Sequence, residues 1–246
     1  MNYNPFSLEG KKILVTGASS GIGSAIAIEC SKLGATVILL GRNIERLSNI
    51  FKKLEGQNHE MFSVDLTNSQ EVIKIIEALP ELNGVVHAAG INQKMPLKFL
   101  NEEIVNDIFN TNVFSSLYLT KYLFKKKKLL KESSIVFISS ISSHYASIGN
   151  IVYMASKGAV TSMSRGIALE LSRQQIRVNT IEPGMILTNL IKDYSEETIL
   201  EDLKNYPLGR YGNTLDVAYG AIYLLSDAAQ WVTGTSITVD GGVTLR

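Results

Sequence analysis

The chain has 246 residues, 45% of them hydrophobic, and carries 24 basic and 23 acidic side chains. This balance of charge gives no reason to expect a nucleic-acid partner, and the single cysteine, Cys30, excludes an internal disulfide. No Cys/His cluster has the spacing of metal ligands, so we expect no metal. The start of the chain has no apolar signal segment and no apolar run approaches ~18 residues, so we expect a cytoplasmic protein without a membrane span.

Short β-branched runs alternate with longer amphipathic stretches along the chain. The runs predict strands at residues 12–16, 36–40, 60–64, 84–88, 134–138, 177–181 and 236–239. The amphipathic stretches predict helices at residues 21–33, 44–54, 69–78, 102–126, 151–172 and 215–225. Because the runs are apolar nearly throughout, we expect strands that are buried on both faces of a parallel sheet.

Strand–helix alternation over residues 1–246 predicts a single α/β domain. The expected architecture is a doubly wound parallel sheet of about seven strands with helices on both faces. In such sheets, ligands bind beyond the carboxyl ends of the strands. The chemistry is therefore expected in the turns that follow the strands.

The first of these turns is rich in glycine and serine. It reads Thr16-Gly17-Ala18-Ser19-Ser20-Gly21-Ile22-Gly23, follows a predicted strand and opens a predicted helix. Glycine adopts backbone angles that other residues avoid, and the helix start offers unpaired N–H groups and a partial positive charge to a phosphate. The alternative is a tight connection without a ligand. The place of the turn between strand and helix favours a cofactor pyrophosphate, with contacts from Gly17, Ser19, Ser20, Gly21 and Ile22.

The spacing Gly17-x-x-x-Gly21-x-Gly23 resembles that of the short-chain dehydrogenase/reductase family, and the resemblance extends along essentially the whole chain. Further motifs follow in the family's order: Asn112 in Asn-Thr-Asn-Val, Ser140 thirteen residues before Tyr153, the pair Tyr153 and Lys157, Pro183-Gly184, and Val239-Asp240-Gly241-Gly242. The resemblance implies a Rossmann-like fold and an oxidoreductase that is similar to 3-oxoacyl-carrier-protein reductases and related ketoreductases.

One motif departs from the family. Where the family usually has Asn-Asn-Ala-Gly after the fourth strand, this chain has His87-Ala88-Ala89-Gly90. The asparagine that Ala88 replaces would tie neighbouring strands through its side chain, so this tie is in doubt. Cofactor contact at Ala89 and Gly90 should survive, because it depends on the backbone and on small side chains. His87 is either catalytic or structural, and the structural interpretation is favoured because Tyr153 fills the proton-transfer role.

The end of the second strand, Leu40-Gly41-Arg42, bears on the choice of nicotinamide cofactor. An NAD site needs a carboxylate that accepts hydrogen bonds from the adenosine ribose, and Gly41 offers none. The Arg42 guanidinium can pair with a ribose 2′-phosphate, which favours NADP(H) over the alternative of a solvated arginine at a helix start. Relatives that use NADP often carry a second basic residue where this chain has Ser20, so some use of NAD(H) is also expected.

Two later turns complete the expected cofactor site. Asp65 and Leu66, at the end of the third strand, resemble the family's contact to the adenine, and the alternative for Asp65 is a cap for the following helix. By resemblance, Ile186 and Thr188, after Pro183-Gly184, hold the nicotinamide carboxamide.

The candidate reaction centre combines Tyr153 with Lys157, which are four residues apart and therefore share one face of a helix. A hydride that reaches a carbonyl carbon must be matched by a proton on oxygen, and a tyrosine with an ordinary pKa of ~10 exchanges protons poorly near neutral pH. A nearby cation favours the phenolate, so we expect Lys157 to lower the pKa of Tyr153 and also to hold the nicotinamide ribose.

Two further side chains are expected at this centre. Ser140 should hydrogen-bond the substrate oxygen, and family spacing favours it over its neighbours Ser139, Ser142 and Ser143. By resemblance, Asn112 kinks its helix and anchors a water that relays protons to Lys157. The alternative for Asn112 is a helix-surface asparagine.

The sequence says little about the substrate. Residues 185–207, with Tyr194 and Tyr206, are expected to form a mobile lid, as in the family. Loop 91–97 and four side chains should face the substrate, namely Ser140, Ser142, His144 and Tyr153. Such a wall fits 3-oxoacyl chains, cyclic polyols or sugars, and small ketones alike. A basic run could receive an acidic carrier protein, although a solvated helix end is the favoured interpretation; the run comprises Lys125, Lys126, Lys127, Lys128 and Lys131.

Together these features predict an NADP(H)-dependent oxidoreductase that interconverts a carbonyl and a secondary alcohol in the reductive direction, on a small molecule such as a carrier-bound 3-oxoacyl thioester. Alternatives are an NAD(H)-dependent alcohol, polyol or sugar dehydrogenase, a non-catalytic nucleotide-binding regulator, and an epimerase or dehydratase. The presence of Tyr153 and Lys157 argues against the regulator, and the short segment after Val239 argues against the last class. The resemblance also implies a homotetramer, assembled through the last strand and the two long helices that carry Asn112 and Tyr153.

Overall fold

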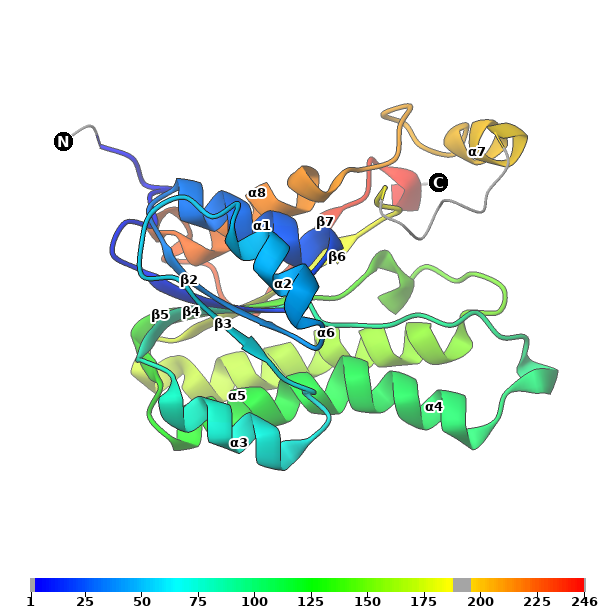
Figure 1. Ribbon diagram of the computed structural model, residues 1–246. Helices are drawn as coiled ribbons and strands as arrows, with labels where there is room; N and C mark the ends of the chain where they lie inside the picture. Colours follow the sequence, from blue (N-terminus) through cyan, green and yellow to red (C-terminus); the bar gives the residue numbers. More distant parts are fainter. Residues whose placement is uncertain (1–2, 188–195, 246) are drawn as a thin grey trace.

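A parallel β-sheet runs through the middle of the molecule (Figure 1). The computed structural model describes residues 3–187 and 196–245. Within these residues the sheet has seven strands in the order β3-β2-β1-β4-β5-β6-β7, and all neighbouring strands are parallel. The strands are β1 (Lys12–Thr16), β2 (Thr36–Gly41), β3 (Glu60–Ser63), β4 (Leu82–His87), β5 (Leu129–Ile138), β6 (Arg177–Pro183) and β7 (Ser236–Val239).

Helices cover both faces of this sheet (Figure 1). One face carries α1 (Gly21–Lys32), α2 (Ile44–Phe51) and α8 (Thr214–Leu225). The other face carries α3 (Ser69–Ala78), α4 (Glu102–Phe109), α5 (Ser115–Lys125) and α6 (Ile151–Leu171). A further helix, α7 (Glu196–Leu203), stands apart from the sheet, at the end of the molecule where the C-terminus lies. The predicted doubly wound α/β fold is therefore confirmed, and none of the described helices has the length and hydrophobicity needed to cross a membrane.

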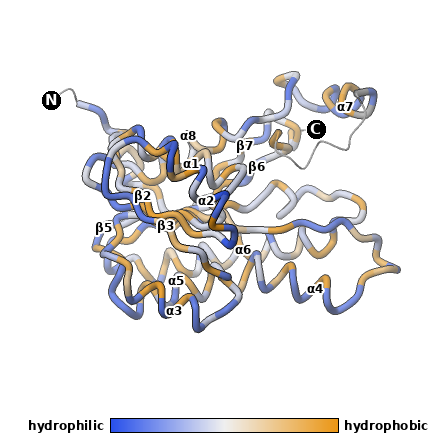
Figure 2. Tube along the Cα trace, in the orientation of Figure 1, coloured by the Kyte–Doolittle hydropathy of each residue, from blue (hydrophilic) through white to orange (hydrophobic). Residues whose placement is uncertain are grey.

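Each face of the sheet has its own hydrophobic core, which explains why the strands are apolar on both sides. Side chains alternate along β1: Ile13 and Val15 pack with α1 and α8, whereas Leu14 packs with α3, α5 and α6. All three side chains are fully buried, and burial of one such side chain contributes about 1.5–3 kcal/mol. Figure 2 shows the same pattern, with hydrophobic colour concentrated along the central strands.

The two edge strands differ from the prediction of full burial. Most residues of β3 and β7 are only partly buried, because each of these strands has a neighbour on one side only. The central strands β1, β2, β4 and β6 match the prediction, since nearly all of their residues are buried.

The helix predicted over residues 102–126 is interrupted. After α4 the chain passes through a π-helical turn, Asn110–Phe114, before α5 begins. There the N–H of Ser115 donates to the carbonyl of Asn110, five residues earlier, which widens the turn. Such turns often occur at functional sites. The wide turn places Asn112 in the interior, where it is 3% exposed.

Candidate active site

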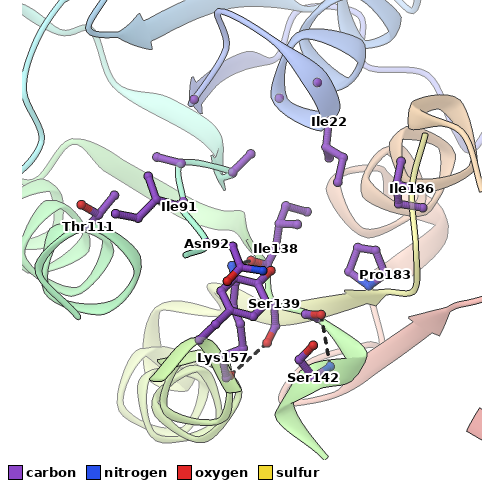
Figure 3. A pocket seen from close by; sticks show the side chains of 18 of the residues that line it. Ile22, Ile91, Asn92, Thr111, Ile138, Ser139, Ser142, Lys157, Pro183 and Ile186 are labelled. Atoms are coloured by element: carbon purple, nitrogen blue, oxygen red, sulfur yellow. Dashed lines mark hydrogen bonds between the residues drawn. The ribbon is translucent and has the colours of Figure 1, made fainter. Parts of the chain in front are cut away.

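A cavity of about 780 Å³ opens at the carboxyl ends of the strands. It lies where the strand order reverses, since β2 and β3 lie on one side of β1 and β4 to β7 lie on the other. The segments that follow β1 to β6 all contribute to its wall. Figure 3 shows Ile22 from α1, Lys157 from α6 and Ile186 from the segment after β6 arranged around this space. This is the position that the doubly wound topology predicts for a ligand.

The glycine turn between β1 and α1 is tightly folded against its surroundings. Gly17 has a φ of +62°, a left-handed backbone conformation that residues with a side chain rarely adopt. A Cβ on this residue would lie 2.8 Å from the carbonyl oxygen of Ala88. A Cβ on Gly23 would lie 2.5 Å from the carbonyl oxygen of Gly17. The turn therefore has no room for side chains at either position, and α1 begins directly against the end of β1.

The N-terminus of α1 differs from those of α2, α3, α4 and α8, and like that of α6 it has neither a side-chain cap nor an acidic residue in its first turn. Asparagine side chains cap α2, α3, α4 and α8, and each of these helices has an acidic residue in its first turn. In contrast, Ser20 makes no side-chain cap on α1, and the first turn of α1 has no acidic residue. The free N–H groups and the positive end of the helix dipole suit an anion such as a pyrophosphate. All five predicted contacts line the cavity here: Gly17, Ser19, Ser20, Gly21 and Ile22.

Thr16, a residue that sequence reasoning missed, supplies a tie at the position where Ala88 has no polar side chain. Its buried hydroxyl accepts hydrogen bonds from the N–H groups of Ala88 and Ala89, at 3.1 and 3.2 Å. The same hydroxyl donates to the carbonyl of Val86 at 3.4 Å. The end of β1 is thus joined to the turn after β4, where Ala89 and Gly90 line the cavity as predicted. A threonine directly before the glycine turn is the signal that could have identified it.

His87 lies in the core and is not among the residues that line the cavity. Its ring stacks on Phe137 with 4.5 Å between ring centroids, and its Nε2 lies 2.9 Å from the hydroxyl of Thr120. Because that hydroxyl donates to the carbonyl of Ser116, His87 is the donor in this pair. Burial lowers the pKa of His87 to about 3, so the ring is neutral at physiological pH. These contacts fit a structural histidine.

Two arginines stand at the end of the cavity next to β2. Arg42 follows this strand, and Arg46 lies in the first turn of α2; both are exposed and line the cavity. Sequence reasoning found only the first of these cations. A basic residue four positions after Arg42, on the helix that starts there, is the signal that was overlooked.

Asp65 lines the cavity close to these arginines, but it does not cap the following helix. Its Oδ1 accepts hydrogen bonds from the N–H and the hydroxyl of Thr67, at 2.9 and 2.8 Å, while Asn68 caps α3. The two bonds from Thr67 and the charge of Arg42 hold the pKa of Asp65 below its ordinary value. The capping alternative is therefore wrong, and Asp65 stands with Leu66 as an ionised hydrogen-bond acceptor at the cavity wall.

Tyr153 and Lys157 extend from one face of α6 to the cavity wall, together with Ser140 from the end of β5. The ammonium nitrogen of Lys157 lies 5.6 Å from the centre of the Tyr153 ring and donates to the carbonyl of Ile138 at 2.8 Å. The hydroxyl of Ser140 accepts a hydrogen bond from the N–H of Ser142 at 3.1 Å. The structure thus brings together the three side chains that the motifs predicted for the reaction centre.

Burial governs the pKa values of this pair. It raises the pKa of Tyr153, and the hydrogen bond with Ser140 opposes this rise, so the expected lowering by Lys157 is not found. Burial also lowers the pKa of Lys157 to about 8. At neutral pH, Tyr153 is therefore a protonated phenol beside an ammonium group, a state in which it can donate a proton.

Asn112 joins the turn after β4 to α6. Its Oδ1 accepts from the N–H of Ile91 at 2.8 Å, and its Nδ2 donates to the carbonyl of Ile91 and to the hydroxyl of Ser156, at 2.9 and 3.1 Å. A Cβ on Gly90 would lie 3.3 Å from Asn112 Oδ1 and 3.5 Å from Lys157 Nζ, so both groups lie close to Gly90 at the cavity wall, although Asn112 itself is not among the lining residues. The alternative of a helix-surface asparagine is wrong.

The rest of the cavity wall mixes apolar residues with a set of polar ones. The residues concerned come from the turn after β4, the turn after β5, the start of α6 and the end of α7: Asn92, Lys94, Ser142, Tyr145, Ser147, Asn150, Asp202, Asn205 and Tyr206. Near the end of α7, the hydroxyl of Tyr211 donates to Asp202 at 2.6 Å, and the rings of Tyr206 and Tyr211 meet edge to face. Of these residues, Ser142 and Tyr206 were named from the sequence, and Asn92 and Lys94 belong to loop 91–97, which was expected to face the substrate.

One predicted substrate contact, His144, is not among the described residues that line the cavity, and its Nδ1 lies 3.6 Å from a carboxylate oxygen of Glu182. Thr188 lies outside the described residues, as does Tyr194 of the expected lid. Ile186, the other predicted carboxamide contact, is buried at the cavity wall and forms a bridge with Gly212.

The lysine run lies at the opposite end of the sheet from the cavity. Lys126 forms an ion pair with Glu77 at 2.9 Å, and Lys128 donates to the carbonyls of Glu77 and Leu79, so the two lysines join the end of α5 to α3. The cavity lies beyond the other end of β5, ten residues long, which corresponds to about 30 Å. A carrier docked on these lysines would be far from Ser140, and the contacts fit a helix end instead.

The fold and the cavity define a dinucleotide-binding α/β protein with a tyrosine–lysine pair. A sequence model of the family described as Enoyl-(Acyl carrier protein) reductase matches residues 17–244. The 3-oxoacyl-[acyl-carrier-protein] reductase of Bos taurus is 35% identical over 239 residues, which cover 96% of this chain and 98% of the relative. Gluconate 5-dehydrogenase of Gluconobacter oxydans is 31% identical over 248 residues, which cover 98% of this chain and 97% of the relative.

Solved structures agree with these sequence relatives. A short-chain type dehydrogenase/reductase from Mycobacterium ulcerans superposes with a TM-score of 0.90 at 33% identity, covering 98% of this chain and 92% of that one. The chain belongs to the short-chain dehydrogenase/reductase family. It is an NAD(P)-dependent oxidoreductase that acts on CH–OH groups.

Proposed function

We propose that the protein is an NADP(H)-dependent reductase that converts a carbonyl into a secondary alcohol, with Tyr153 as the proton donor. The observation that carries this proposal is that Ser140, Tyr153 and Lys157 line the same cavity as the open N-terminus of α1. The helix end suits the pyrophosphate of a dinucleotide, and the polar side chains suit a carbonyl oxygen.

In this mechanism the protein handles the oxygen of the substrate, while the nicotinamide, when bound, supplies the hydride. The hydroxyl of Ser140 donates a hydrogen bond to the carbonyl oxygen and orients it. Tyr153 donates its phenolic proton to the same oxygen. The ammonium group of Lys157, 5.6 Å from the ring centre, stabilises the phenolate that remains. Oxidation of an alcohol uses the same groups in reverse.

Two residues have further roles in this proposal. Lys157 also holds the nicotinamide ribose, and Asn112 anchors a water that relays protons to it. The position of Asn112 supports this role, because its amide holds Ser156, the residue next to Lys157.

The cofactor proposed is NADP(H). Arg42 and Arg46 offer two cations at the cavity wall near β2, and Gly41 offers no carboxylate to a ribose hydroxyl. Asp65 and Leu66 would contact the adenine. The carboxamide contacts proposed are Ile186 and Thr188.

The first candidate substrate is a 3-oxoacyl thioester, free or carrier-bound. The full-length similarity to a 3-oxoacyl-[acyl-carrier-protein] reductase supports it. The second candidate is a polyol or sugar acid, supported by polar side chains at the cavity wall, among them Asn92, Ser147 and Asn205, and by the similarity to a gluconate 5-dehydrogenase. Residues 185–207 would close over either substrate as a lid.

A panel of four reactions tests these proposals. The parent is assayed for reduction of acetoacetyl-coenzyme A with NADPH or NADH, and for oxidation of gluconate with NADP⁺ or NAD⁺, by the absorbance of the nicotinamide. We expect the highest kcat/KM for acetoacetyl-coenzyme A with NADPH. Faster gluconate oxidation would favour the second substrate, and absence of turnover in all four reactions would contradict both.

We also propose a homotetramer. Large apolar side chains are exposed on α5 and α6, among them Tyr118, Phe124 and Leu169. Trp231, which precedes β7 in the chain, is 99% exposed, and Leu245, which follows it, is 84% exposed. Exposed apolar groups of this size suit contacts between subunits.

A further inference from the structure

Glu182 is a buried carboxylate that the proposed mechanism does not use. It lies at the carboxyl end of β6, is 4% exposed, and precedes Pro183, which lines the cavity. A buried carboxylate is costly unless hydrogen bonds and a counter-charge compensate for lost hydration. The partners of Glu182 therefore indicate what the charge holds in place.

One carboxylate oxygen of Glu182 accepts two hydroxyl hydrogen bonds. The donors are Ser143, at 3.0 Å, and Thr161, at 2.9 Å. The other oxygen faces Nδ1 of His144 at 3.6 Å. Glu182 thus joins β6 both to α6 and to the turn that follows β5.

The contacts of Thr161 continue to Ser139, the residue before Ser140. Thr161 Oγ1 lies 3.0 Å from Ser139 Oγ, and Ser139 Oγ donates to the main-chain carbonyl of Lys157 at 2.9 Å (Figure 3). The N–H of Ser139 also donates to the carbonyl of Ile181, on β6, at 2.8 Å. The residue on the N-terminal side of Ser140 is therefore fixed to both β6 and α6.

The residues on the C-terminal side of Ser140 form a short turn. The Ser140 hydroxyl accepts from the N–H of Ser142 at 3.1 Å, and the Ser140 carbonyl accepts from the N–H of Ser143 at 3.0 Å. Because the hydroxyl of Ser143 donates to Glu182, the last residue of the turn is attached to β6. Ser140 thus has attached residues on both sides: Ser143 donates to Glu182, and Ser139 contacts Thr161, which also donates to Glu182.

We propose that Glu182 is a positioning residue: its carboxylate, which accepts hydrogen bonds from Ser143 and from Thr161 of α6, holds the segment that carries Ser140 in place against α6. This inference rests on the proposed function, in which Ser140 orients the substrate carbonyl. It also gives His144 a different role from the substrate contact expected from the sequence. His144 donates from Nδ1 to the hydroxyl of Ser143, 2.9 Å away, and faces the carboxylate.

Three variants and one control test the proposal, each compared with the parent in the presence of NADPH. Glu182→Ala removes the carboxylate, Glu182→Gln keeps an oxygen that accepts from both hydroxyls, and Ser143→Ala removes one attachment by a milder change. The control is Asn179→Ala, on the same strand, which removes buried hydrogen bonds to Val232 and Thr235 that are remote from Ser140.

Two measurements are made on each protein. Steady-state kinetics with acetoacetyl-coenzyme A should show that kcat falls about 10- to 100-fold in Glu182→Ala and falls to a lesser extent in Ser143→Ala, since a misplacement of about 1 Å can have an effect of this size. The KM for NADPH should stay at the parent value, and Glu182→Gln should restore most of kcat. Hydrogen exchange should become faster in the peptide over residues 139–145 of the alanine variants, and not in the control.

Parent-like kcat and parent-like exchange in Glu182→Ala would overturn the proposal. If this variant does not fold, the same result in Ser143→Ala overturns it. An equal fall of kcat in Asn179→Ala would also overturn it, because the effect would then reflect stability alone. If the parent shows no turnover in any of the four panel reactions, the proposed function fails. The hydrogen-exchange measurement then still decides whether Glu182 holds this segment.

Discussion

Replacing Lys157 by methionine should change how the stability of the protein depends on pH. Lys157 is 6% exposed, and burial lowers its pKa from 10.5 to about 8. Methionine has a similar length and carries no charge. Lys131, whose side chain is 69% exposed, gives a matched control in Lys131→Met.

The direction of the effect follows from the two pKa values. Below pH 8, Lys157 is protonated in the folded and the unfolded chain, so the folded state carries the whole cost of burying the charge. Between pH 8 and 10.5 the folded protein releases this proton while the unfolded chain keeps it, and the free energy of unfolding therefore rises with pH. A pKa difference of about 2.5 corresponds to about 3 kcal/mol, most of it gained by pH ~10.

Urea unfolding followed by circular dichroism at intervals from pH ~7 to ~10 measures this effect. The free energy of unfolding of the parent, minus that of Lys157→Met, should increase by about 2–3 kcal/mol over this range. The difference between the parent and Lys131→Met should stay constant. A constant difference for Lys157→Met as well would refute the reasoning, because Lys157 would then titrate as an ordinary lysine.

Three further predictions concern the cofactor, the glycine turn and the assembly. Arg42→Ala should weaken NADPH binding about 10- to 150-fold, because a charge-assisted hydrogen bond is lost, and should leave NADH binding unchanged. Arg46→Ala should act in the same direction. Fluorescence titrations that show equal losses of affinity for both cofactors would contradict this prediction. Thr16→Val should lower the free energy of unfolding by about 1–3 kcal/mol, because it leaves the N–H groups of Ala88 and Ala89 without their acceptor; an unchanged unfolding curve would count against this tie. Light scattering at micromolar protein should give the mass of a tetramer, and a monomer mass would exclude it.

Much of the fold could be predicted because buried parallel strands leave a strong signal in the sequence. Strands β1 and β7 and helix α3 have the predicted bounds. The first part of β5 was missed because Lys131 and Glu132 interrupt its apolar pattern, and Glu132 has a φ of +66°. Helix α7 was missed because most of its eight residues are acidic or polar, and its apolar residues Ile199 and Leu203 pack only on a small cluster with Tyr206 and Tyr211.

The candidate site was predictable where a motif carries it. Tyr153 and Lys157 are close in sequence and share a helix face, so their spacing alone places them together. Thr16 and Arg46 stand at short spacings from Gly17 and Arg42 that were overlooked, whereas Glu182 has no such spacing, and its contacts depend on how distant strands and helices meet. The π-helical turn at Asn112 has the same origin, because Ile91 and Ser156 hold the asparagine from two other segments.

The kinetics of Tyr153→Phe test the central claim most directly. Phenylalanine keeps the ring and removes only the group that donates the proton. With acetoacetyl-coenzyme A and NADPH, or with the panel substrate that the parent turns over fastest, we predict that kcat falls about 10²- to 10⁴-fold while the Kd for NADPH stays at the parent value. A variant that keeps near-parent kcat would contradict the claim that Tyr153 is the acid of this reaction.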